Sequence, residues 1–120
     1  MAFGRKRKNR MINYIPDRGD VVILDFDPTR GKEQKGKRPG VIMSLKEFNQ
    51  YGLCYVLPIT SKSKGYNSEV PFTGNVIKGN ILTNQMKCID WTIRNLKYIE
   101  KIDSSVLFEI EVRLRTILDL

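Results

Sequence analysis

Short apolar runs separated by polar stretches that contain glycine dominate the first hundred residues of the chain. Runs rich in β-branched and aromatic residues with such breakers between them are typical of β-strands. The pattern predicts strands over 21–26, 39–44, 53–59, 69–72, 79–83, 86–91 and 97–102. It also predicts two polar loops, over 27–37 and 60–67, and a helical turn within 45–51.

The last segment of the chain changes its period. Apolar residues recur there at steps of three and four, which is the signature of an amphipathic helix: Val106, Leu107, Ile110, Leu114, Ile117 and Leu118. Asp103 or Ser104 is the expected N-cap. Two Glu–Arg pairs are spaced four residues apart in the favoured order, Glu109 with Arg113 and Glu111 with Arg115. Strands at short spacing followed by one helix predict a strongly bent β-sheet or small barrel with the helix packed against it.

Charge divides the chain into a tail and a body. The chain has 120 residues, enough for one domain, and its net charge is +8. Five cations lie in the first ten residues, a segment without acids. We therefore expect a basic, disordered tail over 1–13 and a single domain over 14–120. A second basic cluster follows over 30–38, and such clusters attract phosphate polyanions or acidic proteins. For the tail, a solvated segment without a ligand is an equal alternative.

Several features restrict location and chemistry. The sequence has no apolar run of about 20 residues, which a membrane-spanning helix needs. Its basic start is followed by polar residues, whereas a secretory signal would continue with an apolar stretch. We expect a soluble, cytoplasmic protein that does not bind membranes. Cys54 and Cys88 lie in predicted strands, where isolated thiols are typically buried core residues. The sequence contains no histidine, the commonest metal ligand and general base near neutral pH.

The most informative stretch is 16–44, which reads PDRGDVVILDFDPTRGKEQKGKRPGVIMS. It resembles the opening of the MazF/PemK/Kid toxin family, in which P-x-x-G-D, a strand, D-x-x-P-x-x-G-x-E-Q and then R-P follow one another. A second block, PITSKSKGY over 58–66, is similar to the family's P-x-T-[ST] element followed by SKGY. A third, over 84–91, matches the segment where many members have D-Q-x-[KR]. The resemblance covers 14–120 and implies a β-rich (α+β) fold, an SH3-like small β-barrel of the CcdB/MazF type with a C-terminal helix.

The activity implied by this resemblance is that of a toxin from a type II toxin–antitoxin system. Such a toxin is a sequence-selective endoribonuclease that cleaves single-stranded RNA, mRNA above all, and so inhibits translation and growth. It needs no metal or other cofactor, because the 2′-hydroxyl of the RNA attacks the phosphate and leaves 2′,3′-cyclic phosphate and 5′-hydroxyl ends.

Two residues match the family's active-site positions, Arg38 and Thr60. Physically, a guanidinium is a fixed planar donor for phosphate oxygens, and a threonine hydroxyl can hold one in place. Glu33 is a candidate base, although it could instead order the neighbouring cations. Arginine is a poor base because its pKa lies above about 12.

Further residues are candidates for RNA binding. They are Arg30, Lys32, Gln34, Lys35, Lys37, Ser61, Lys64, Tyr66, Asn84, Gln85 and Lys87. Two of these depart from relatives, since some members have His where Lys32 stands and many have Asp where Asn84 stands. Acid–base chemistry that uses that His and Asp cannot operate in this chain. Tyr66 and Trp91 could stack on unpaired bases, although Trp91 is more typical of a core residue.

The resemblance also implies partners. They are a second copy of the chain in a homodimer, with the 106–118 helix near its interface, and a cognate acidic antitoxin of the MazE type. We expect the antitoxin to cover the 27–37 loop, and DNA to be contacted only indirectly through the antitoxin. Two alternatives stay open, a CcdB-like toxin that binds and inhibits gyrase and a non-catalytic nucleic-acid-binding barrel, because a fold alone does not decide function.

Overall fold

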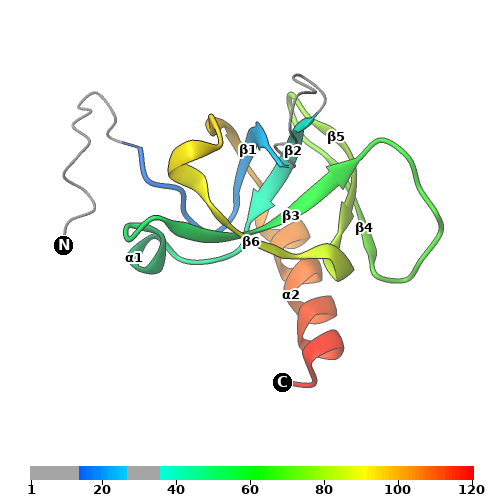
Figure 1. The fold of residues 1–120 in the computed structure, drawn as a ribbon. Helices are drawn as coiled ribbons and strands as arrows, with labels where there is room; N and C mark the ends of the chain where they lie inside the picture. The colour runs from blue at the N-terminus through cyan, green and yellow to red at the C-terminus, as the bar shows by residue number, and fades with distance from the viewer. Residues whose placement is uncertain (1–13, 27–35) are drawn as a thin grey trace.

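The computed structural model describes residues 14–26 and 36–120, and the predicted basic tail lies outside this range (Figure 1). The described residues contain every strand that the sequence pattern predicts, together with the C-terminal helix. In chain order the elements are β1 (Asp20–Asp25), β2 (Lys37–Ile42), α1 (Lys46–Asn49), β3 (Leu53–Thr60), β4 (Glu69–Thr73), β5 (Lys78–Leu82), η3 (Thr83–Gln85), β6 (Lys87–Asp90), η4 (Trp91–Ile93), β7 (Lys97–Lys101) and α2 (Ser104–Leu118).

One strand boundary differs from the prediction in a way that matters for the site. The predicted loop runs to residue 37 and the predicted strand starts at 39, whereas β2 starts at Lys37. Pairing with β1 explains the difference, since Leu24 faces Arg38 and Asp25 faces Lys37. The polar residues at the start of β2 read as loop in the sequence, yet the antiparallel partner holds them extended. Arg38 therefore lies on a strand.

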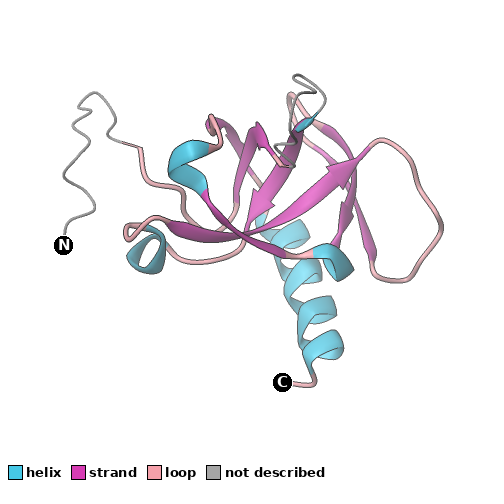
Figure 2. Cartoon of the chain, in the orientation of Figure 1, coloured by secondary structure: helices cyan, strands magenta, loops and turns pink. Residues whose placement is uncertain are grey.

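The strands form one antiparallel sheet in the order β4-β5-β3-β2-β1-β7. β3 is its longest strand and joins two parts of it. β2 pairs along one edge of β3, and the other edge pairs with β6 over its first half and with β5 at its end. The sheet curls into a half-barrel, and α2 packs across it and extends beyond it at its C-terminal end (Figures 1 and 2). The predicted fold class, β-rich with a C-terminal helix, is confirmed.

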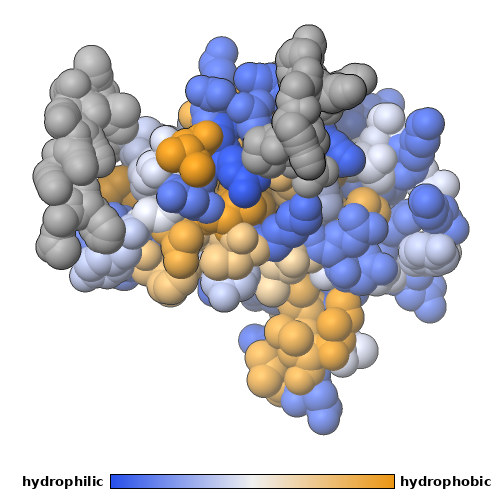
Figure 3. All heavy atoms as spheres, viewed as in Figure 1, coloured by the Kyte–Doolittle hydropathy of each residue, from blue (hydrophilic) through white to orange (hydrophobic). Residues whose placement is uncertain are grey.

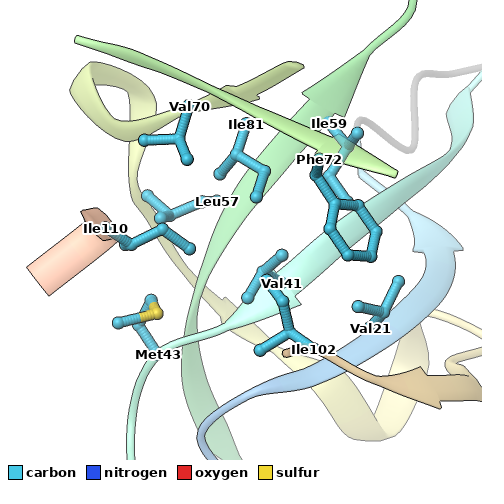
Figure 4. Close-up of a cluster of buried hydrophobic side chains, with 10 residues drawn as sticks. All are labelled: Val21, Val41, Met43, Leu57, Ile59, Val70, Phe72, Ile81, Ile102 and Ile110. Carbon is cyan, nitrogen blue, oxygen red and sulfur yellow. The ribbon is translucent and has the colours of Figure 1, made fainter. Parts of the chain in front are cut away.

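Both faces of the sheet are buried, which explains why its strands read as continuous apolar runs. Under α2, one core cluster contains Val21, Val41, Met43, Leu57, Ile59, Val70, Phe72, Ile81, Ile102 and Ile110 (Figure 4). On the opposite face a second cluster contains Val22, Leu24, Phe26, Ile42, Cys54, Val56 and Ile89. Alternate residues of β3 therefore serve two cores. Ile110 is fully buried, which contributes about 2 kcal/mol at typical transfer values.

The prediction that both cysteines are core residues is half wrong. Cys54 is buried, and burial raises the pKa of its thiol to about 12. Cys88 is exposed, because it faces Tyr55 across the β3–β6 pair and Tyr55 is itself on the surface. Neighbouring strand residues point to opposite faces, so the apolar Ile89 enters the second core cluster and Cys88 cannot.

Helix α2 confirms most of its predicted features. Asp103 is the N-cap, although its carboxylate accepts a hydrogen bond from the Ser105 hydroxyl and caps no backbone N–H. Glu109 and Arg113 form the predicted ion pair, at 2.6 Å. The predicted pair of Glu111 with Arg115 is wrong, because Glu111 lies 4.0 Å from Arg18 instead, near the start of the domain. Within the part of the chain that the structure describes, no helix has the length and apolar character that crossing a membrane requires.

Helix α2 and the chain end expose several large apolar side chains, namely those of Phe108, Val112, Ile117, Leu118 and Leu120. Figure 3 shows apolar atoms covering much of the protruding end of the helix. Exposed apolar patches of this kind mark interaction surfaces in many proteins.

Candidate active site

Arg38 and Thr60 line the same open hollow, which has a volume of about 490 Å³. The register of β2 and β3 brings them there. Gly40 faces Pro58 in this antiparallel pair, and two further steps along each strand lead to Arg38 and Thr60. The Arg38 side chain is exposed and Thr60 is half-buried, so both are accessible from solvent. The fold therefore brings together two of the three residues that were expected to be catalytic, and the third, Glu33, lies outside the described residues.

A close approach of backbones shapes the wall of the hollow beyond Thr60. Thr60 pairs with Asn80 of β5. A Cβ atom at Gly79 would lie 2.5 Å from the Thr60 carbonyl oxygen, so only glycine allows β5 to lie this close to β3. The hollow is completed by Ser61 and by the start of β5 with the turn before it, namely Val76, Ile77 and Lys78. Lys78 adds a second cation to the hollow.

The Thr60 hydroxyl is held by its own chain. Its Oγ1 atom accepts a hydrogen bond from the backbone N–H of Lys62 at 3.2 Å. A hydroxyl that accepts one hydrogen bond still has a proton to donate. Because the bond to Lys62 restricts its rotation, Thr60 offers that proton in a limited set of directions. Such a group suits an anionic oxygen in the hollow.

The loop that follows Thr60 is organised by Glu69, a residue that sequence analysis missed. The Glu69 carboxylate accepts hydrogen bonds from the Ser63 hydroxyl at 2.9 Å and from the Lys64 backbone N–H at 3.0 Å. The backbone hydrogen bond from Lys64 is the main cause that lowers the pKa of Glu69 below its ordinary 4.5, and it acts against burial. In the sequence an isolated acid in a polar stretch reads as a solvated residue, and only the fold shows that Glu69 is buried and turned toward the loop.

Two of the predicted RNA-binding residues lie on this loop and outside the hollow. Lys64 and Tyr66 are exposed, and Figure 1 shows the loop between β3 and β4 reaching away from the sheet. Arg113 of α2 holds the far end of the loop through a 3.2 Å hydrogen bond from its Nε to the Asn67 carbonyl oxygen. Lys64 and Tyr66 are thus placed to contact a ligand that extends beyond the hollow. Of the predicted RNA-binding residues that follow Thr60 in this loop, only Ser61 lines the hollow itself.

The predicted residues of the third sequence block lie on η3 and β6, and β6 pairs with β3. Asn84 and Gln85 are exposed on η3, and Lys87 is exposed at the start of β6. Lys87 faces Val56, four residues before Thr60, which corresponds to about 13 Å along the strand. Residues four apart on a strand point to the same face, so Lys87 shares the face of Thr60. Its Nζ lies 5.8 Å from the centre of the Phe26 ring.

Of the remaining predicted residues, two are described by the structure and lie outside the hollow, and the others lie outside the described range. Lys37 is exposed and its Nζ lies 3.7 Å from Asp25 Oδ1, outside the hollow lining. Trp91 donates a 2.8 Å hydrogen bond from its ring nitrogen to the Asn49 carbonyl oxygen and packs against the second core cluster, which is a structural role. The others lie outside the described residues: Arg30, Lys32, Glu33, Gln34 and Lys35.

The described residues offer no grouping of three or more His, Cys, Asp or Glu side chains that could hold a metal ion. The charged groups that line the hollow over its described part are cations, Arg38 and Lys78. Such a hollow favours an anion as its ligand.

The structure defines the class of protein as a small β-rich domain, in which a curled antiparallel sheet with a C-terminal helix carries an arginine and a threonine in one basic hollow. Residues 17–118 match the family described as the PemK-like, MazF-like toxin of type II toxin–antitoxin systems. The chain belongs to this family.

Individual relatives agree with this assignment. The chain is 45% identical over 82 residues to the endoribonuclease toxin MazF of Escherichia coli K12, which covers 68% of this chain and 74% of that protein. The crystal structure of MazF from Deinococcus radiodurans superimposes with a TM-score of 0.80 at 33% identity, over 90% of this chain and all of that one. A MazE–MazF crystal structure from the same organism gives 0.79 at 29% identity, over 90% and 99%.

Proposed function

We propose that this chain is the toxin of a type II toxin–antitoxin system and cleaves single-stranded RNA at the hollow formed by Arg38 and Thr60. The observation that carries the proposal is the convergence of these two residues, which are far apart in sequence, in one accessible basic hollow. The similarity to the E. coli endoribonuclease toxin MazF supports the reaction class.

The proposed reaction is an internal transesterification. The 2′-oxygen of the RNA loses its proton and attacks the adjacent phosphorus, the bond from phosphorus to the 5′-oxygen breaks, and that oxygen takes up a proton. The products are a 2′,3′-cyclic phosphate and a 5′-hydroxyl. No metal or cofactor takes part, since the nucleophile belongs to the substrate.

Arg38 and Thr60 serve the phosphate in this reaction. The guanidinium of Arg38 donates to the non-bridging phosphate oxygens, whose negative charge increases in the transition state. The Thr60 hydroxyl donates to one of these oxygens and fixes the phosphate beside Arg38. Removal of the 2′-proton is assigned to Glu33, which lies outside the described residues.

The rest of the RNA follows the sheet away from the hollow. Lys87 lies on the same face as Thr60 and supplies a cation for the RNA backbone. Asn84 and Gln85, close to it in the chain, supply amide groups for the bases. On the other side of the hollow, Lys64 and Tyr66 contact the RNA strand, and the tyrosine ring is available for stacking on a base. The predicted contacts of Arg30, Lys32, Gln34, Lys35 and Lys37 belong to the same proposal.

Two protein partners are part of the proposal. A second copy of the chain covers the exposed apolar side chains of α2, and an acidic antitoxin of the MazE type covers the basic hollow in the resting cell. The MazE–MazF structure from D. radiodurans supports the second partner by similarity. The toxin then acts in the cytoplasm, where its mRNA substrate is.

The deciding experiment is incubation of the purified chain with a long RNA of mixed sequence, followed by mapping of every new end. We expect cuts at one short motif, with cyclic phosphate and 5′-hydroxyl ends and an unchanged rate in excess EDTA. A 2′-deoxy residue before the cut should abolish cleavage. Cleavage of that substrate would contradict the internal attack, and intact RNA with every substrate would favour a gyrase-binding toxin or a non-catalytic RNA-binding protein.

A further inference from the structure

Glu100 connects the two ends of the sheet. It lies on β7, and its carboxylate reaches the turn between β4 and β5. Oε1 accepts the backbone N–H of Asn75 at 2.8 Å, and Oε2 accepts those of Val76 at 3.2 Å and Ile77 at 2.9 Å. β4 and β7 are the terminal strands in the sheet order, so this side chain closes the curled sheet across its open side.

The surroundings of this contact are shaped to hold the carboxylate. A Cβ atom at Gly74 would clash with Glu100 Oε2 and with the ring of Phe72, so the turn needs glycine at this position. The pairing of β1 with β7 shifts register beside Glu100, since Val21 faces Glu100 but Val22 faces Tyr98. Such bulges redirect side chains. Both local features favour a Glu100 side chain directed at the turn.

The electrostatics of Glu100 agree with this geometry. Burial raises the pKa of the carboxyl group, but the hydrogen bonds from Ile77, Asn75 and Val76 together outweigh burial and lower the pKa below its ordinary 4.5. The carboxylate is therefore charged at neutral pH and accepts all three bonds. Hydrogen bonds to a charged acceptor are about twice as strong as those between neutral groups.

The anchored turn forms a wall of the candidate active site. Val76 and Ile77 line the hollow together with Arg38 and Thr60, and Lys78 follows directly on β5. Ile77 also packs against the core cluster under α2, so its backbone is held from two sides. Without Glu100, three backbone donors of the turn would lose their common acceptor, and the turn could move relative to Arg38 and Thr60.

We propose that Glu100 is a positioning residue of the ribonuclease site, fixing the 75–77 turn as the wall that holds the scissile phosphate against Arg38 and Thr60. The proposal rests on the proposed function and deepens it. Glu100 does not touch RNA in this scheme. It acts through the turn, and small displacements of a positioned substrate can cost as much as about 10²-fold in rate.

The test compares Glu100→Gln with Glu47→Gln, a matched change at an exposed acid on α1. Glutamine keeps the size of the side chain but replaces one acceptor oxygen by a donor amide that faces backbone N–H groups. We expect kcat for RNA cleavage to fall about 10-fold with little change in KM, because the exposed cations that bind RNA are untouched. Amide hydrogen exchange should accelerate at Asn75, Val76 and Ile77 and stay unchanged at Val22. Glu47→Gln should match the parent in each measurement.

A double variant separates positioning from general loss of stability. Positioning acts through the hollow, so Glu100→Gln should cost much less activity in a Thr60→Val background than in the parent, whereas independent effects add. Equal losses in both backgrounds would overturn the proposal. So would a Glu100→Gln variant with faster exchange in the turn and the parent's kcat, and in that case the ribonuclease assignment would stand. A parent chain that cleaves no RNA would refute the proposed function itself, while the exchange data would still report whether Glu100 anchors the turn.

Discussion

Arg38 of β2 and Thr60 of β3 are separated by twenty-one residues in the chain and lie at facing ends of two paired strands, where both side chains line one hollow. The arrangement depends on backbone register, and a slip of one residue would turn one of the two side chains to the opposite face of the sheet. Gly40 opposite Pro58 lies two steps from the pair and belongs to the same buried register. The pairing of the two strands therefore sets the backbone positions of both residues.

Replacement of Arg38 by alanine should lower kcat/KM for RNA cleavage by about 10²-fold or more, because a donor directed at the developing phosphate charge is lost. The side chain is exposed, so the thermal unfolding midpoint should change little. Arg38→Lys should restore little activity, since an ammonium group does not reproduce the planar fork. Steady-state cleavage of a short fluorescent RNA measures both variants. A lysine variant with full activity would show that charge alone suffices.

Thr60→Val tests a single hydroxyl at nearly constant shape. The variant removes the proton that Thr60 donates to the phosphate and also the acceptor for the Lys62 N–H, so we expect a loss of activity that is smaller than that of Arg38→Ala. Thr60→Ser keeps the hydroxyl and should retain most of the rate. The same fluorescent substrate serves as the assay. If valine and serine behave alike, the hydroxyl has no part in the reaction.

The strands of this fold could be predicted from sequence because their apolar runs are bounded by clear breakers, and the helix because its period is regular. The site was predictable in part, since the resemblance pointed to Arg38 and Thr60. Lys78, Glu69 and Glu100 could not be found that way. Their roles come from pairings between strands distant in sequence, and an isolated acid or lysine in a polar stretch carries no sign of the partner it will meet.

The β3–β4 loop should depend on the ionisation of Glu69. The pKa of this group is lowered in the folded protein, so its contribution to stability is present above its ordinary value of 4.5 and is lost as the pH falls through the lower folded value. The Lys64 amide should therefore stay protected from exchange at pH 5 and lose protection only in more acidic solution. Glu69→Gln should remove the protection at every pH, which NMR-detected hydrogen exchange can follow. A Lys64 amide that exchanges at the same rate in both proteins would exclude this anchoring role.

Binding of the antitoxin should depend on the same cations as binding of RNA. Arg38 and Lys78 give the hollow a positive character, and an acidic, flexible segment that folds onto it would be attracted by the same charges that attract RNA. Because such a segment also brings apolar side chains, its complex should weaken less than RNA binding when salt is raised. Arg38→Ala should lower the affinity for both RNA and antitoxin, whereas Glu47→Gln should change neither affinity.

A competition titration decides between direct occlusion and inhibition at a distance. The probe is an RNA with a 2′-deoxy residue at the cut, which binds without being cleaved, and the cognate antitoxin is added at rising concentration. Direct occlusion predicts release of the RNA in a stoichiometric and mutually exclusive manner, since one hollow cannot hold a phosphate and a carboxylate-bearing segment together. A stable ternary complex, with the RNA still protecting Arg38 from chemical modification, would mean that the antitoxin acts from another surface. Because the hollow is open and lined by the fixed ends of β2, β3 and β5, we expect displacement.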